Sequence, residues 1–172
     1  MSRTLTSLAC LGLALTASAC GDDAATPWNP VWAAHEVAML DAVNAVRAEG
    51  AVCGETPYPP THPLALDATI QIASRGHSLD MATQDFFDHA SLDGRSFSDR
   101  MEATGFAGAY PWGENIQAGA STAAEAVASL LTSPPHCENM MSPEYFVAGF
   151  GYASDPNSTY EHYWTQNFAG GH

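Results

Sequence analysis

The sequence predicts a single α+β sandwich domain, and three observations support this prediction. The chain has 172 residues, which is enough for one domain and a leader but not comfortably for two. Apolar residues make up 46% of the chain, so it can bury a packed core. They recur at helical spacing along most of the chain, whereas the C-terminal part is rich in aromatic and β-branched residues. Helices before and between the strands of a small sheet are typical of the α+β class.

The N-terminus has the pattern of a secretory leader. Arg3 is the only charge in the first 21 residues, and the apolar run "LACLGLALTASAC" is too short to span a membrane. The small residues directly before Cys20 resemble a bacterial lipobox, in which the cysteine receives a lipid; ordinary cleavage with Cys20 as a bystander is the alternative. We therefore expect a lipoprotein signal peptide at 1–19, a tether at 20–31, and a domain at 32–172 that is exported and anchored to the bacterial cell envelope through Cys20.

Two of the four cysteines remain for the domain itself. Cys10 leaves with the leader and Cys20 is the expected lipidation site, so Cys53 and Cys137 are left. A pair of cysteines in an exported domain most often forms a disulfide. His136 directly precedes Cys137, and adjacent residues point apart on a helix, so His136 is poorly placed to activate its neighbour as a nucleophile. We predict a disulfide between Cys53 and Cys137.

Two longer helices are predicted in the first half of the chain. The first runs from residue 31 to Gly50, and its apolar stripe is formed by Val37, Leu40, Val43 and Val46. The second begins after Pro63, and its stripe is formed by Leu66, Ile70, Ala73, His77 and Met81. On this stripe His77 is expected to be a core histidine and not a ligand. The stretch "VCGETPYPPTHP" between the two helices predicts a loop.

Three shorter helices and a small sheet are predicted after residue 95. Ser96-x-x-Asp99 and Thr122-x-x-Glu125 are capping-box patterns that each begin a helix. Two prolines at 134–135 end the second of these helices and suit the first turn of another that carries residues 136–140. "YFVAGFGYA" and "YEHYWTQNFAG" flank the turn formers "SDPNS" and predict an antiparallel hairpin, with "ENIQAG" as a third strand.

The charge of the chain excludes one class of partner. It has 19 acidic residues, five arginines and no lysine, which gives a formal net charge of −14. So negative a surface repels phosphate backbones, and we expect no nucleic-acid partner. Cations, neutral lipids and glycans are the partners that this charge favours.

Three polar residues at the ends of predicted elements are candidates for chemistry: His89, Glu114 and His136. Two imidazoles and a carboxylate would make a three-ligand site for a divalent cation, with an open position for water. Their spacing alone does not show that they meet. Three separate, solvated polar residues are the alternative.

The order of several motifs resembles the CAP superfamily, which includes cysteine-rich secretory proteins, antigen 5 and class 1 pathogenesis-related proteins. The motifs are "LDAVNAVRAEGA", "FFDHASLDGRSFSDRM", "GENIQAG", "SPPHCENMM", "GFGYA" and "YWTQNFAG", and the resemblance extends over residues 36–170. The chain is most similar to the bacterial SCP-domain branch. The resemblance implies a three-layer α-β-α sandwich with a small central antiparallel sheet. It also implies a surface cleft lined by His89, Glu114 and His136.

One departure from the family concerns a second acidic residue that many members carry before the second histidine. Ser133 or Thr132 stands at that place here, so Ser133 is a candidate for the cleft and a divalent cation such as zinc is expected to bind only weakly. The resemblance implies an extracytoplasmic binding module for a lipid, sterol-like, glycan or peptide ligand, with no catalytic residue assigned. A metal-dependent hydrolase of a cell-envelope substrate, using the same cleft, is the alternative. We expect a monomer whose only membrane contact is the N-terminal lipid.

Overall fold

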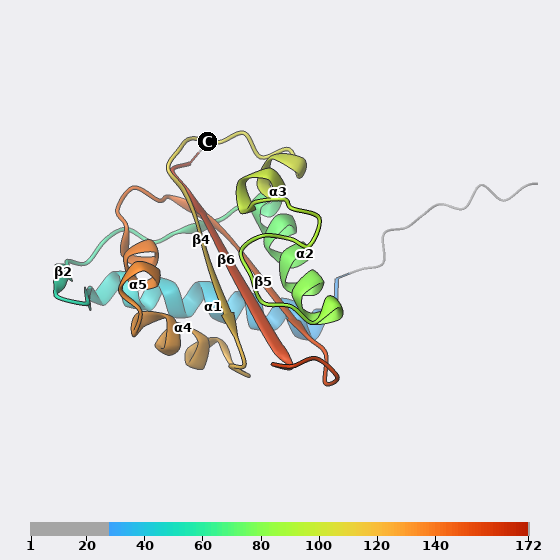
Figure 1. The fold of residues 1–172 in the computed structure, drawn as a ribbon. Coiled ribbons are helices and arrows are strands. Elements are labelled where there is room, and N and C mark those ends of the chain that lie inside the picture. The colour runs from blue at the N-terminus through green and yellow to red at the C-terminus, as the bar shows by residue number, and fades with distance from the viewer. Residues whose placement is uncertain (1–27, 172) are drawn as a thin grey trace, which may run out of the picture.

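The computed structural model describes residues 28–171 and has the three layers of an α-β-α sandwich (Figure 1). Its helices are α1 (Pro30–Glu49), α2 (Ala68–Gln84), α3 (Phe97–Ala103), α4 (Ala123–Leu131) and α5 (Pro134–Met141). Its strands are β1 (Ala51–Cys53), β2 (Thr56–Tyr58), β3 (Ala65–Leu66), β4 (Trp112–Ala118), β5 (Val147–Ser154) and β6 (His162–Ala169). One face of the central sheet carries α2 and α3, and the other carries α1, α4 and α5 (Figure 1).

The central sheet contains the three strands that the sequence predicts and a fourth that it does not. Its order is β3-β5-β6-β4, in which β6 pairs antiparallel with both β5 and β4. The two-residue strand β3 pairs parallel with β5, so the sheet is mixed at this edge. Leu66, which the helical pattern places on the second helix, belongs to β3, and Asp67 caps α2 directly after it. The segment predicted as a loop contains the β1–β2 hairpin.

The buried face of α1 differs from the predicted apolar stripe. The helix buries Glu36, Met39, Val43 and Arg47, whereas the side chain of Val37 is 57% exposed. The predicted stripe is right in part, since Val43 is buried and Leu40 and Val46 pack partly buried against the core. Apolar spacing could not find the two buried residues that are charged. Both find partners far away in the sequence: Glu36 pairs with Arg75 of α2, and Arg47 donates hydrogen bonds to backbone carbonyls.

The boundaries that local signals predict are confirmed. Ser96 and Thr122 form capping boxes at the starts of α3 and α4. Pro134 opens α5.

The helix α2 lies directly against β5 of the central sheet, where a Cβ at Gly149 or Gly151 would collide with the backbone of the helix. This close approach fixes α2, and through it the loop that follows, relative to the sheet.

The N-terminal predictions fall largely outside the described residues. The predicted signal peptide (1–19) and Cys20 are not among residues 28–171. The last part of the predicted tether (20–31) overlaps the folded domain, since α1 begins at Pro30 and the indole of Trp28 donates to Glu36 over 2.9 Å. Within the described part of the chain, no helix combines the length and apolarity needed to cross a membrane.

Candidate functional site

His89 and Glu114 meet in a direct hydrogen bond on the α2 face of the sheet. Glu114 projects from β4 and its side chain is 1% exposed. The Nδ1 atom of His89 lies 2.8 Å from Oε1 of Glu114 and donates to it. This bond raises the pKa of His89 above its ordinary value of 6.5, although partial burial of the ring opposes the change. His89 is therefore the more basic of the histidines at this site.

Arg100 joins this pair and was not found by sequence reasoning. Its Nη2 donates to Oε2 of Glu114 over 2.7 Å, and its Nη1 donates to the backbone carbonyl of His89 over 3.0 Å. The same Nη1 also reaches Ser91 and the carbonyl of Arg95, so one buried guanidinium ties the loop 86–96 to β4. The only signal in the sequence is that one of just five arginines directly precedes the apolar Met101 on a short predicted helix.

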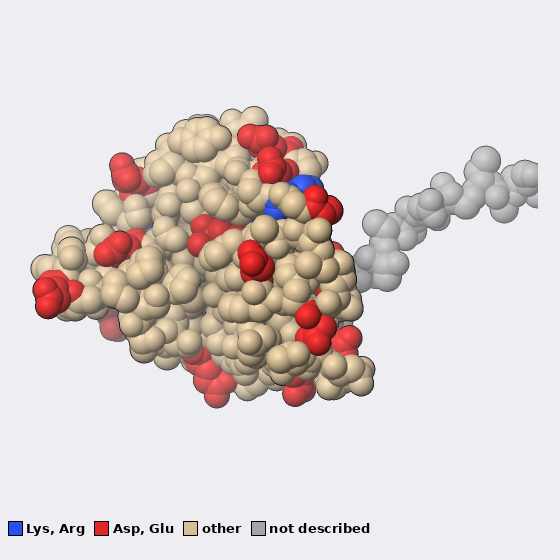
Figure 2. Space-filling model, viewed as in Figure 1, with Lys and Arg blue, Asp and Glu red and all other residues tan. Residues whose placement is uncertain are grey.

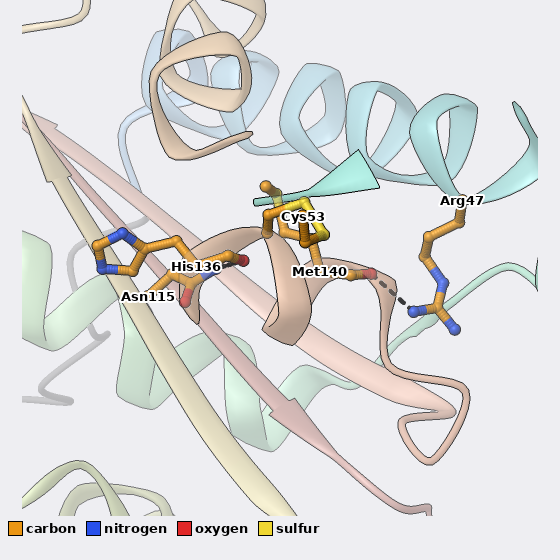
Figure 3. The surroundings of a disulfide bond; sticks show 6 residues. Arg47, Cys53, Asn115, His136 and Met140 are labelled. Carbon is orange, nitrogen blue, oxygen red and sulfur yellow. Dashed lines mark hydrogen bonds between the residues drawn. A yellow bond between two sulfur atoms is a disulfide. The ribbon is translucent and has the colours of Figure 1, made fainter. Parts of the chain in front are cut away.

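His136 reaches the site from the other side of the sheet, on the first turn of α5. The predicted disulfide is present and joins Cys137, the next residue, to Cys53 of β1, with their Cα atoms 5.4 Å apart. Asn115 of β4 donates to the backbone carbonyl of His136 over 2.9 Å (Figure 3). At the end of the helix, Arg47 donates to the carbonyl of Met140 over 2.8 Å (Figure 3). The backbone around residue 136 is thus fixed by the disulfide at the next residue and by the hydrogen bonds from Asn115 and Arg47.

Two buried residues outside the site support the elements that carry it. Arg47 is fully buried and binds four backbone carbonyls, and burial lowers its pKa to about 10. His77 is a core histidine whose Nε2 lies 3.0 Å from the carbonyl of Asp88, and burial lowers its pKa to about 4. A neutral His77 therefore supports the loop that carries His89.

A groove runs between the two histidines. A cavity of about 300 Å³ is lined by Phe87, Asp88, His89, Ile116 and His136. A second cavity of about 290 Å³ shares Phe87, Ile116 and His136 with it and continues toward the end of α4. Because three residues line both, the cavities form one groove, which we call the cleft. Burial and the nearby charge of His89 lower the pKa of His136, so the two imidazoles differ in basicity.

The other predicted cleft residues take different places. Ser133 lines the second cavity, and within the described residues its side chain makes no capping hydrogen bond to α5. Glu114 lies behind His89 and is not among the lining residues of either cavity. Phe87 and Ile116 were not predicted, and they give the cleft its apolar wall.

The three residues proposed as metal ligands do not fit a three-ligand site in this arrangement. One oxygen of Glu114 accepts from His89 and the other from the cationic Arg100, so neither points to a common centre with His136. Among residues 28–171, no group of three His, Cys, Asp or Glu side chains could hold a metal ion. A weakly bound zinc stays a prediction that these contacts do not support.

The sequence matches the family model of the cysteine-rich secretory protein family, CAP, over residues 40–168. The chain belongs to the CAP family. It is 30% identical over 137 residues to the Bacillus subtilis protein YkwD, covering 80% of this chain and 48% of YkwD. It is 28% identical over 141 residues to the B. subtilis membrane protein YlbC, covering 82% of this chain and 36% of YlbC. The CAP chain thus spans less than half the length of either relative.

Solved structures share the fold at low sequence identity. An extracellular SCP-domain protein of Bacillus anthracis superposes with a TM-score of 0.66 at 24% identity, covering 84% of this chain and 44% of that one. An outer surface protein of Borrelia burgdorferi superposes with a TM-score of 0.62 at 14% identity, covering 78% of this chain and 93% of that one. These likenesses confirm the predicted CAP/SCP fold.

Proposed function

We propose that this CAP chain is an exported, lipid-anchored binding module whose cleft captures an uncharged or weakly polar ligand. The observation that carries the proposal is the groove itself, in which His89 and His136 face the same cavity beside the apolar side chains of Phe87 and Ile116. A site of this size with an apolar wall and few polar groups is typical of ligand-binding clefts.

The contacts around Glu114 bear on the chemistry of the ligand. Its carboxylate is buried and neutralised by Arg100, so it does not attract a cationic ligand into the cleft. His89, with the raised pKa, offers a hydrogen-bond donor, and His136, with the lowered pKa, can also accept. Hydroxyl and amide groups, as in glycans, peptides and lipid headgroups, match this pair.

Binding can be tested by native mass spectrometry of the full chain extracted from bacterial membranes. We expect a bound ligand mass on the wild type that is lost in His136→Ala, because this substitution removes one polar side of the cleft. His62→Ala is the matched control, since His62 is half-buried, stacks on Phe146 and lines neither cavity of the cleft. A ligand mass that persists equally in all three proteins, or is absent from all, contradicts the proposal.

The anchor is supported by the small residues before Cys20 and by the extracellular and outer-surface descriptions of the B. anthracis and B. burgdorferi proteins. We expect Cys20→Ser to move the domain from the membrane to the soluble fraction, because the lipid is its only attachment. Cys10→Ser is the control and should leave the distribution unchanged. Unchanged membrane partitioning of Cys20→Ser, with no lipid mass on the mature protein, would show that the anchor is elsewhere.

One observation favours a hydrolase as the second candidate. A more basic and a less basic imidazole on one cavity are suited to act as general acid and general base. This chemistry would use His89, His136 and the hydroxyl of Ser133 on an envelope substrate, without any role for Glu114 beyond orienting His89. Conversion of the bound ligand to products by the wild type, and not by His136→Ala, would favour the enzyme over the binding module.

A further inference from the structure

Strand β4 ends the central sheet, and its outer edge borders the cleft. Within residues 28–171, β6 is the only strand that pairs with β4. The N–H of Gly119 donates to the carbonyl of His162, and the N–H of Gly170 donates to the carbonyl of Pro111. The odd-numbered residues of β4 therefore face β6. Because successive residues of a strand alternate, the even-numbered ones direct their N–H and C=O groups to the outer edge.

The outer edge is blocked at some positions and open at others. The carbonyl of Glu114 accepts from Asn139 over 3.3 Å, as expected for an even-numbered residue whose backbone groups face the outer edge. The carbonyl of Ala118 accepts from the side chain of Gln117 over 2.8 Å. In the described part of the chain, no hydrogen bond outside the sheet reaches the N–H or C=O of Ile116 or the N–H of Ala118. Two donors and one acceptor therefore face outward.

These groups lie within the cleft. Ile116 lines both of its cavities, and Ala118 lines the second. The side chain of Ile116 packs in the cluster on the α2 face, with Phe87 and His89 beside it in the first cavity. Ser133 and His136 lie on the α4–α5 side in the second cavity. The outer edge of β4 thus lies at the bottom of the cleft, between Phe87 and His89 on one side and Ser133 and His136 on the other.

We propose that the occupant of the cleft is an extended peptide that adds to β4 as a further strand of the sheet. This inference rests on the proposed binding function and names its ligand class. A peptide backbone matches the unpaired donor–acceptor–donor row of Ile116 and Ala118, with one residue exchanging both bonds with Ile116. Its side chains alternate between the two walls, as in any strand. A glycan or an acyl chain does not repeat donors and acceptors at this spacing.

The charge around the edge selects among peptides. Asp88 is the one carboxylate among the residues that line the two cavities, and neither cavity is lined by an arginine. On the face seen in Figure 2, the acidic groups are scattered and most of the surface is uncharged. The net charge of the chain is −14. An uncharged peptide fits this surface, and an acidic one is repelled.

The probe is the blocked neutral peptide acetyl-Thr-Val-Ser-Val-Thr-amide, added to the ¹⁵N-labelled domain, with the fully N-methylated peptide as control. We expect the unmodified peptide to slow hydrogen exchange at the amides of Ile116 and Ala118. The methylated peptide cannot donate backbone hydrogen bonds and should have no effect. Slow exchange with both peptides, or with neither, overturns strand addition.

A pair of substitutions tests the same contact from the side of the protein. Ala118→Pro removes an outward N–H that the sheet does not use, and proline is tolerated at such edge positions. Ala118→Val keeps the N–H at similar side-chain volume. We expect proline to weaken peptide binding about three- to tenfold relative to valine, because one of about three hydrogen bonds is lost. Equal affinity of the two variants contradicts the proposal.

The outcomes separate this inference from the binding function on which it rests. If the peptide leaves the cleft amides unchanged while a His136-dependent ligand mass is still found on the extracted protein, strand addition is wrong and the binding module stands. If chitotriose or a short-chain phospholipid shifts the cleft signals without slowing exchange at Ile116, the ligand is a glycan or a lipid and the inference fails. If no probe and no extracted ligand binds, both proposals fail.

Discussion

His89 and His136 face one cavity, but the two sides of the cleft are held by different interactions. His136 stands on a helix that a disulfide ties to β1 and that Asn115 and Arg47 fix through backbone carbonyls. His89 stands in a loop, residues 86–96, that contains no helix or strand. That loop depends on one buried cation, Arg100, which binds both its backbone and the carboxylate partner of His89.

The comparison indicates that the two sides can be loosened separately. A disulfide and hydrogen bonds to carbonyls do not depend on the charge of any carboxylate, whereas a buried ion pair fails when either partner is removed. The His89 side also sets the basicity of its histidine through Glu114, while on the other side the contacts reach only the backbone of residue 136. The loop side of the cleft is therefore held by charged side chains, and the α5 side is held by a disulfide and by hydrogen bonds to the backbone.

The largest effect is expected from Arg100→Met. This change removes the buried cation beside Glu114 and leaves its carboxylate only the hydrogen bond from His89. It should lower the free energy of unfolding by about 3 to 5 kcal/mol, measured by urea denaturation. Hydrogen exchange should rise in residues 86–96 and stay unchanged in α5. Adding Glu114→Gln should recover part of the lost stability, because position 114 then carries no charge to be buried.

Arg95→Met is the matched control for this prediction. Arg95 pairs with Asp93 on the surface, where the two side chains are 45% and 56% exposed. Solvent weakens such a pair, so its loss should change stability little. If Arg100→Met is no more destabilising than Arg95→Met, the loop does not depend on the buried cation.

A somewhat smaller effect is expected from removing the disulfide with Cys53→Ala and Cys137→Ala. The bond joins residues 84 apart, and its loss should cost about 2 to 5 kcal/mol of stability. Hydrogen exchange should rise in α5 and not in residues 86–96. Reductant should loosen the wild type in the same way and leave the double variant unchanged. Loosening of the loop to the same extent as α5 would show that the two sides form one unit.

Local signals in the sequence predicted most of the helices and strands. The features that were missed depend on contacts between residues far apart in the chain. The capping boxes at Ser96 and Thr122 and the aromatic and β-branched C-terminal strands around a turn are local patterns, and each was found in its place. On the buried face of α1, Glu36 and Arg47 were missed because they are buried only through partners distant in the chain. Two-residue strands such as β3 carry too little pattern to detect.

The site was predictable only in part for the same reason. His89 and His136 were candidates from their places at the ends of elements, and the family resemblance implied that they share a cleft. The structure places both on one cavity. Arg100 was missed because its pairing with Glu114 spans 14 residues and two elements that fold onto each other. The cysteine pair was accessible from composition and compartment alone, since only two cysteines remained for the domain.

The different basicity of the two histidines leads to opposite effects of pH. Because the folded-state pKa of His89 is raised, its contact with Glu114 contributes stability that is fully present below the unfolded value of 6.5 and is lost as pH rises through the folded-state pKa. Because the folded-state pKa of His136 is lowered, its burial costs stability as pH falls below 6.5. The hydrogen bond from His89 to Glu114 causes the first effect, and the burial of His136 near the charge of His89 causes the second.

The central claim, one cleft with two imidazoles of different basicity, is tested most directly by NMR titration of the histidine ring signals between pH 4 and 9. We predict that His89 titrates above 6.5 and His136 below it, and that Glu114→Gln lowers the pKa of His89. Arg95→Met serves as the control and should move neither value. Two histidines that titrate together near 6.5, unchanged by Glu114→Gln, would contradict the account.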